Sequence, residues 1–295
     1  MERSYASRSC FFLFSIILLS LNNLCFAWHQ TGHMLVASVA YKNIDKSILK
    51  KVESLATQGS DQYPMASTFI TSSVWADDIK EHGVNFFNNW HYQDTLFSDD
   101  GTEAPKYSDG KAVIMIKKFK QLLESSDTTL LEKSFALKLF IHLIGDIHQP
   151  MHCASRVTKN FPRGDMGGNM FKIDHPNFRN LHSLWDSGLE ALNELPRPLT
   201  DNEQGWLADY TDSIMSEYSK SSFTDREISS SPKQWMDEGV NIVKNNVYQN
   251  IKSYEAPSQK YLEANRPIIR RQIALAGYRL ANQLNCIYKS DLCIQ

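Results

Sequence analysis

Apolar side chains recur at helical spacing along almost the whole chain after residue 27, and this pattern restricts the fold to a helical one. Apolar stripes of this kind run over residues 34–41, 135–143 and 240–247. Residues three or four positions apart lie on one face of a helix, so each stripe predicts a helix with one buried side. A further helix is expected over 259–284, where Pro267 is predicted to begin or kink it.

Alternating patterns typical of strands are nearly absent. The exception is 167–173, where two glycines predict a turn and the residues after them a short hairpin arm. Two irregular stretches, 97–110 and 158–179, are predicted to be loops that line a binding site. No repeat or low-complexity linker divides the chain. We therefore predict an all-α fold, with a single compact multi-helix domain over 28–295 and at most a small β-hairpin.

The first 27 residues have the features of a secretory signal peptide. Arg3 and Arg8 give a positive start, residues 11–21 form an apolar run, and Ala27 is a small residue suited to cleavage. The alternative is a membrane anchor, but the apolar run is shorter than the ~20 residues that span a bilayer. We predict cleavage after Ala27, so that residues 28–295 form a secreted or periplasmic protein without a membrane segment.

The charge balance excludes a broad basic surface. The full chain has 31 basic and 33 acidic residues. Removal of Glu2, Arg3 and Arg8 with the signal peptide leaves 29 and 32, a formal charge of −3. A slightly acidic protein does not bind duplex DNA through a broad, positively charged surface. Any contact with nucleic acid is therefore expected to be local, in a pocket.

Cysteines are too few for a disulfide scaffold. Of the five, Cys10 and Cys25 leave with the signal peptide, and Cys153, Cys286 and Cys293 remain. Cys286 and Cys293 are close enough in sequence to join and fasten the C-terminal tail in an oxidising compartment. Cys153 is expected to be a small buried packing residue.

Two pairs of histidine and aspartate point to bound metal. His142 and Asp146 are four residues apart, which places an imidazole and a carboxylate on one helix face, where both reach the same divalent ion. Pro150 ends that helix, so His152 can approach from another direction. His182 and Asp186 repeat the spacing. Burying these groups without a cation is costly, and metal coordination usually offsets that cost.

Three upstream positions are weaker candidates. These are His33, Asp77 or its neighbour Asp78, and His91. Taken alone, each has a simpler interpretation, because a single His beside aromatic residues is usually a hydrogen-bonded core residue and an Asp on a helix is usually exposed.

Taken together, the motifs resemble the zinc-dependent, single-strand-specific nucleases of the zinc phospholipase C/nuclease superfamily. The matching motifs occur in order and are Trp28, Thr31-Gly32-His33, Trp75-Ala76-Asp77, His91-Tyr92, the block 142–152, Gly167-Gly168-Asn169, Asn180-Leu181-His182 and Trp185-Asp186. A phospholipase C is the nearest alternative, but its residue matching Asp186 is a Glu. A non-catalytic zinc protein is a second alternative, and its site would be closed by protein ligands.

The resemblance implies three zinc ions. One is held by Asp77, His91, His142 and Asp146, the second by His152, His182 and Asp186, and the third by the backbone of Trp28, His33 and Asp146. The backbone nitrogen of Trp28 binds zinc only as a free amine, so it becomes a ligand only after cleavage from Ala27. Trp75, Trp90 and Trp185 are expected to wall the site. His29 and His148 are expected to have structural roles, and His82 and His175 to be ordinary loop histidines.

The resemblance also implies the reaction. Single-stranded DNA and RNA are hydrolysed to 5′-nucleotides, and 3′-nucleotides are dephosphorylated, by attack of a metal-activated hydroxide on phosphorus. Asp77 and Asp146 are then catalytic as metal ligands, and Lys80 lies where a cation near the phosphate is expected. A solvated side chain is the alternative for Lys80. The protein is expected to act as a monomer.

The resemblance places substrate contacts at three residues. Tyr92 offers a ring on which a base stacks, and Asp94 offers acceptors for a base edge, while Asn169 lies in the glycine-rich motif. Stacking requires an unpaired base, which explains a preference for single strands. The alternative is that Tyr92 is a core residue and Asp94 caps a turn.

Overall fold

The structure is a computed structural model that describes residues 28–106 and 108–289. The predicted signal peptide and Cys293 therefore lie outside the described residues. The α-helices of the described chain are α1 (Gln30–Asn43), α2 (Lys46–Ala56), α3 (Trp75–Glu81), α4 (Ala112–Glu124), α5 (Leu130–Asp146), α6 (Leu181–Asp186), α7 (Asp201–Glu217), α8 (Asp225–Ser229), α9 (Pro232–Ile242) and α10 (Gln259–Tyr288). The predicted all-α fold is confirmed.

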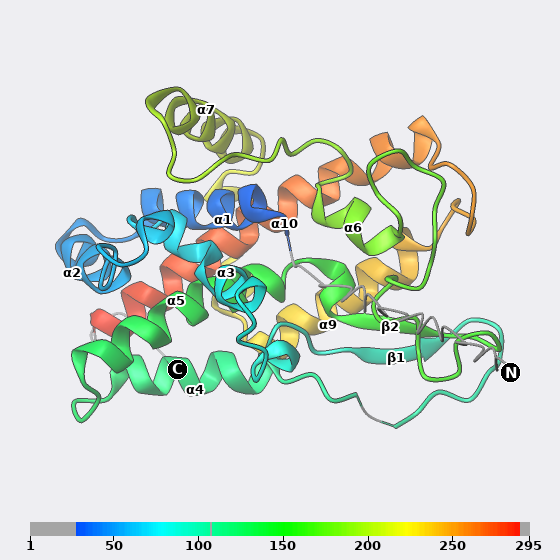
Figure 1. The fold of residues 1–295 in the computed structure, drawn as a ribbon, viewed down its shortest axis with the longest axis horizontal. Coiled ribbons are helices and arrows are strands. Elements are labelled where there is room, and N and C mark those ends of the chain that lie inside the picture. Colours follow the sequence, from blue (N-terminus) through cyan, green and yellow to red (C-terminus); the bar gives the residue numbers. More distant parts are fainter. Residues whose placement is uncertain (1–27, 107, 290–295) are drawn as a thin grey trace, which may run out of the picture.

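Helices α1, α5 and α10 form the centre of the molecule, with α7 on one side and α4 on the other (Figure 1). In α1 every residue from Thr31 to Ala40 is buried, and in α5 every residue from Ala136 to Asp146. A helix that is buried on all sides needs neighbours all round it. Gly277 of α10 allows one such close approach, because a Cβ there would lie 2.4 Å from Cβ of Val39.

Helix ends follow local signals in most places. α5 begins with a capping box in which Thr129 and Glu132 satisfy each other's backbone amides, an arrangement that contributes about 1 kcal/mol. The helical stripe at 240–247 is confirmed, although α9 ends at Ile242 and Val243–Val247 forms a π-helical turn. Pro267 lies inside α10 and does not begin it.

The small sheet differs from the prediction. It consists of β1 (Thr95–Ser98) and β2 (Ala154–Val157), which pair in parallel. Residues 167–173 form no hairpin, and the nearest pairing there is an isolated antiparallel bridge between Lys172 and Asn180. The glycines serve close packing instead, because Gly167 has φ of 59° and a Cβ there would lie 2.3 Å from the carbonyl oxygen of Met151.

Cys153 is buried and free, as expected for a packing residue. It lies against Gly239 of α9, where a Cβ would lie 2.4 Å from its sulfur. Over residues 28–106 and 108–289, none of the helices combines the length and the apolar character that crossing a membrane requires.

Candidate metal centre

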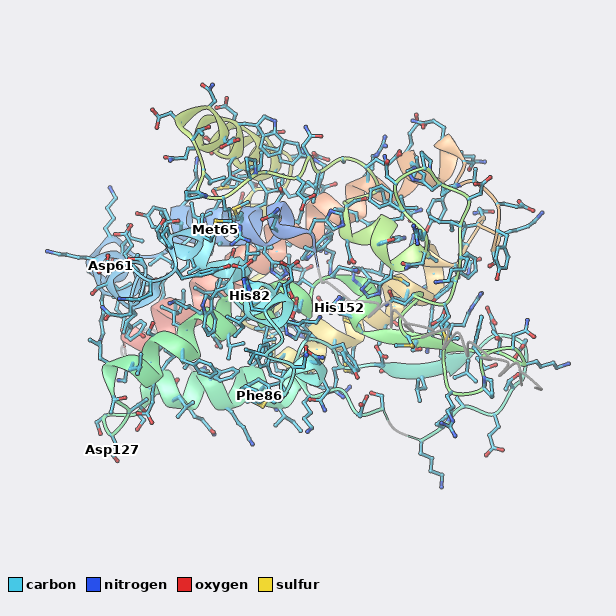
Figure 2. All side chains as sticks on the ribbon, viewed as in Figure 1. Asp61, Met65, His82, Phe86, Asp127 and His152 are labelled. Atoms are coloured by element: carbon cyan, nitrogen blue, oxygen red, sulfur yellow. The ribbon has the colours of Figure 1, made fainter. Side chains whose placement is uncertain are left out.

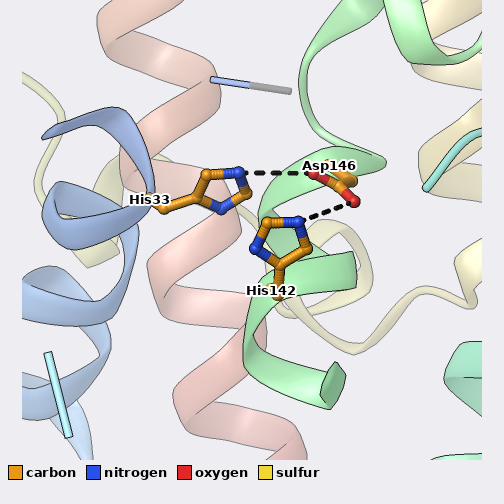
Figure 3. Close-up of side chains that lie close together, drawn as sticks. All are labelled: His33, His142 and Asp146. Atoms are coloured by element: carbon orange, nitrogen blue, oxygen red, sulfur yellow. Dashed lines mark ion pairs between the residues drawn. The ribbon is translucent and has the colours of Figure 1, made fainter. Parts of the chain in front are cut away.

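The C-terminal turn of α5 carries the first pair of candidate ligands. His142 and Asp146 are completely buried, and Nε2 of His142 lies 3.3 Å from Oδ2 of Asp146. Nδ1 of His142 donates to the carbonyl oxygen of Ser73 at 2.7 Å, so Nε2 is the ring nitrogen that faces the carboxylate. The predicted spacing therefore does place both groups on one helix face (Figure 3).

His33 reaches the same carboxylate from α1. Its ring stacks on that of His142 with centroids 4.0 Å apart, and its Nε2 lies 3.4 Å from Oδ1 of Asp146 (Figure 3). Gly145 makes this approach possible, because a Cβ there would lie 2.7 Å from Nδ1 of His33. The glycine in the middle of the motif is thus required by the packing of α1 against α5.

Asp77 and His91 complete the first cluster. Asp77 lies in the first turn of α3, and its Oδ1 is 3.6 Å from Nε2 of His142. His91 follows a short 3-10 turn, and its Nδ1 is 3.0 Å from Oδ2 of Asp146. Asp78 is directed elsewhere, to an ion pair of 2.6 Å with Arg197.

The second cluster joins the end of the same motif to α6. Nε2 atoms of His152 and His182 are 3.1 Å apart, and Nε2 of His182 lies 3.5 Å from Oδ2 of Asp186. Each imidazole is oriented through Nδ1, which donates at 2.7 Å to the carbonyl oxygen of His91 or of Gly167 respectively. His152 lies near the middle of the molecule (Figure 2).

The donor set fits divalent cations. Three groups of the described residues each bring ligand atoms within 4.8 Å of one another. They are His33, His142 and Asp146; Asp77, His91 and His142; and His152, His182 and Asp186. A tetrahedral zinc ion with bonds of ~2.0–2.1 Å separates its ligands by about 3.3 Å, close to the distances above. Buried atoms without a hydrogen bond include both nitrogens of His33 and both carboxylate oxygens of Asp146. Leaving buried polar atoms without partners costs free energy, and a bound cation would offset that cost.

Charge distinguishes the two clusters. Burial disfavours an imidazolium, yet Asp146 and Asp77 raise the pKa of His142 to about 9. Burial likewise opposes ionisation of Asp146, but His142 and His91 hold its pKa well below the usual value. In the second cluster, burial and then His182 lower the pKa of His152 to about 3. The first cluster therefore attracts positive charge, and the second offers an uncharged imidazole as a ligand.

Two buried residues that the sequence did not single out hold the second cluster. Gln149 donates from Nε2 to Oδ1 of Asp186 at 2.5 Å and accepts the amide of Met151 at 2.6 Å. Asp165 accepts the amide of Gly168 at 3.0 Å and the hydroxyl of Tyr248 at 2.6 Å, so it fixes the loop whose carbonyl orients His182. Gln149 lies inside the block 142–152 and Asp165 just before the glycine motif, but their residue types alone do not indicate these roles.

Replacing Gln149 with leucine is expected to weaken metal binding at the second cluster by roughly 10- to 100-fold, because partners that orient metal ligands have effects of that size. The measurement is a zinc titration of the metal-free protein, with Gln204→Leu as a control on the exposed face of α7. Unchanged zinc affinity in Gln149→Leu would show that Asp186 needs no such support.

Trp28 and Lys80 are both buried. The indole of Trp28 donates to the carbonyl oxygen of Gly145 at 3.1 Å, and Gly32 leaves room for it, since a Cβ there would lie 2.6 Å from Cβ of Trp28. Lys80 is only 5 % exposed, so its interpretation as a solvated side chain is wrong. Although burial acts the other way, the imidazoles around Asp77 and then Lys80 lower the pKa of that carboxyl.

The predicted substrate contacts have the following surroundings in the structure. Tyr92 is half-buried and donates its hydroxyl to Asp109 at 2.7 Å, so it is not a core residue. Burial raises the pKa of Asp94 to about 7, and His182 lies near enough to oppose that shift. Asn169 donates from its side chain to the carbonyl oxygen of Met166 at 2.9 Å.

The remaining histidines have other partners. His148 donates to the carbonyl oxygen of Ile144 and accepts from Arg279 at 2.9 Å, so it joins α5 to α10. His175 pairs with Glu190 at 2.7 Å. His82 contacts the backbone of Asp78, and burial lowers the pKa of His29.

The tryptophans beside the ligands anchor their helices in the core. The indole of Trp185 donates to the hydroxyl of Tyr261 at 2.8 Å. Trp75 packs edge to face on Phe135, and Trp90 packs on Phe119. These contacts fix the backbone from which Asp77, His91 and Asp186 project.

A family model for S1/P1 nuclease matches residues 28–289. Endonuclease 4 of Arabidopsis thaliana is 25% identical over 93% of this chain and 94% of its own length. Nuclease S1 of Aspergillus oryzae is 26% identical over 92% and 96%, and nuclease P1 of Penicillium citrinum is 23% identical over 90% and 99%. The nuclease interpretation is therefore confirmed over the phospholipase. The chain belongs to the S1/P1 nuclease family, whose members are metal-dependent phosphodiester hydrolases.

Proposed function

We propose that residues 28–295 hydrolyse single-stranded DNA and RNA to 5′-nucleotides and also remove the phosphate of 3′-nucleotides. The observation that carries this proposal is the convergence of three imidazoles and Asp77 on the buried carboxylate of Asp146, next to a second His/Asp cluster. The names of the relatives, nucleases and endonucleases, support the substrate class.

The proposed cofactor is three zinc ions. Asp77, His91, His142 and Asp146 hold one, His152, His182 and Asp186 hold another, and the backbone of Trp28 with His33 and Asp146 holds the third. Zinc at these positions supplies an activated water at neutral pH and offsets the charge that builds on the phosphate oxygens. Imidazole and carboxylate donors in this number leave room for water and substrate, as in catalytic zinc sites.

The protein's own side chains select and hold the substrate. Lys80 adds a buried positive charge near Asp77, and its proposed role is to pair with the phosphate of the substrate. Tyr92, held by Asp109, offers a ring face to one base, and Asp94 hydrogen-bonds its edge. Asn169 contributes a side-chain amide at the same end. A base reaches this pocket only when it is unpaired, which accounts for the single-strand preference without a basic groove.

Maturation forms part of the proposal. The signal peptide directs the protein out of the cytoplasm, to the periplasm or the exterior, and its removal by cleavage after Ala27 frees the amine of Trp28. The mature protein acts as a monomer, since each proposed ligand comes from one chain.

The test is zinc quantification on the purified mature protein, combined with rates on single-stranded and duplex DNA. We expect three zinc ions per chain and a preference for single strands of about ten-fold or more, because unpairing a base costs a few kcal/mol. Equal rates on single-stranded and duplex DNA would refute the proposed preference for single-stranded substrates. Phosphatidylcholine vesicles serve as the contrasting substrate, and their hydrolysis in place of DNA would refute the nuclease activity.

A further inference from the structure

A cavity of about 640 Å³ opens beside Asp77, at the end of the metal centre where residue 28 lies. Its walls come from the segment 28–30, from Tyr63 and Met65, from α3, and from the segment around Arg197. This volume lies within the range of about 300–1,000 Å³ that is usual for ligand pockets.

The cavity is separate from the proposed base pocket. Asp94 lines a different cavity, with Gln93, Thr95 and residues of α4 and α9. Asp94 also lies near His182 of the second cluster. The two cavities share no lining residue, and of the two only the cavity at Asp77 is lined by candidate metal ligands.

A phosphodiester substrate has two nucleosides and needs two places for them. A 3′-nucleotide contains only the nucleoside that carries the 3′-oxygen, so removal of its phosphate requires that nucleoside to be the one held at Tyr92 and Asp94. The other nucleoside is joined to the phosphate through its 5′-oxygen. It must leave the metal centre in another direction, and the cavity at Asp77 lies in such a direction.

The walls of the cavity suit a flat ring. Tyr63 is half-buried and packs edge to face with His82, with ring centroids 6.4 Å apart and planes at 90°. His29 and Met65 line the same space. Aromatic faces stack on any nucleobase.

The charges suit a base edge better than a second phosphate. Asp78 is neutralised by Arg197, which binds it at 2.6 and 2.8 Å and also contacts Gln30. Glu81 and Glu194 remain as carboxylates at the rim, and Glu194 accepts the amide of Gln30 at 2.9 Å. Carboxylates accept hydrogen bonds from the exocyclic amino groups of bases and repel phosphate.

We propose that this cavity binds the nucleoside linked through its 5′-oxygen to the cleaved phosphate, with Tyr63 stacked on the base and Glu81 accepting its amino group. This inference rests on the proposed function and adds a second specificity site to it. Bases with an exocyclic amino group, such as adenine, are favoured there over uracil or thymine.

The test compares two substrates with the zinc-loaded protein. One is a dinucleoside monophosphate with adenine as the second base, and the other is the 3′-nucleotide of the first, which has nothing to place in the cavity. Tyr63→Ala is expected to lower the ratio of kcat/KM for the dinucleotide to that for the 3′-nucleotide by about ten-fold, the scale of one lost stack. Tyr63→Phe keeps the ring and should retain most of that ratio.

Glu81→Gln provides a second measurement, because an exposed helix-terminal residue is replaced without disturbing the core. It is expected to remove most of the preference for adenine over uracil as the second base, whereas Glu124→Gln at the end of α4 leaves that preference intact. Unchanged ratios and preferences in both Tyr63→Ala and Glu81→Gln would overturn the inference while the nuclease function stands. Failure of the unaltered protein to cleave either substrate would overturn the function itself.

Discussion

Replacing Asp146 with asparagine is expected to lower kcat/KM on single-stranded DNA by on the order of 1,000-fold or more, because metal stabilisation of the transition state is worth several kcal/mol. Asp146 is shared by two of the three proposed zinc sites, the one with Asp77, His91 and His142 and the one with Trp28 and His33. Its two oxygens lie 3.4 Å from His33 and 3.0 Å from His91, and neither has a hydrogen bond. An amide offers one weaker oxygen donor where the carboxylate offers two.

Zinc content should fall in the same variant, since three imidazoles lose their common anion. Asp127→Asn is the matched control, because Asp127 is exposed in the loop before α5, at the edge of the molecule (Figure 2). Its kcat/KM and zinc content should equal those of the unaltered protein. A ten-fold loss or less in Asp146→Asn, with full zinc content, would show that this carboxylate does not hold the metals.

The helical fold was predictable because its signal is local. Stripes of apolar residues at a spacing of three or four positions mark α1, α5 and α10, whose packing depends on those same residues. The sheet was not predictable in this way. β1 and β2 are distant in sequence and only four residues long, and a parallel pair gives no turn signal between its strands. Gly167 and Gly168 suggested a hairpin, but they serve a close approach to Met151.

The candidate ligands could be found because helix geometry makes a spacing of four meaningful, as in His142 with Asp146 and His182 with Asp186. The residues that orient them could not. Gln149 acts on Asp186, 37 positions away, and Tyr248 acts on Asp165 across 83 positions. Such partners come into contact only when the chain is folded, and the residue type, glutamine or tyrosine, does not predict the contact. The burial of Lys80 could not be predicted from the sequence for the same reason, because it depends on the folded chain.

A version of the chain that keeps even a few residues before Trp28 is expected to bind two zinc ions instead of three and to lose most of its activity, on the order of 100-fold or more. The nitrogen of a peptide bond has its lone pair delocalised into the carbonyl group. It therefore cannot replace the free amine as a ligand. Zinc analysis and kcat/KM on single-stranded DNA measure both effects.

The structure makes this test selective for the amine. The side chain of Trp28 is completely buried, its indole is bonded to Gly145, and Gly32 packs directly against it. The extension therefore changes the charge and donor capacity at one atom while these contacts hold the residue in place. An equal extension at the C-terminus is the control, and an aminopeptidase that trims the added residues should restore both zinc and rate. Three tightly bound zinc ions at full rate in the extended protein would exclude the amino terminus from the centre.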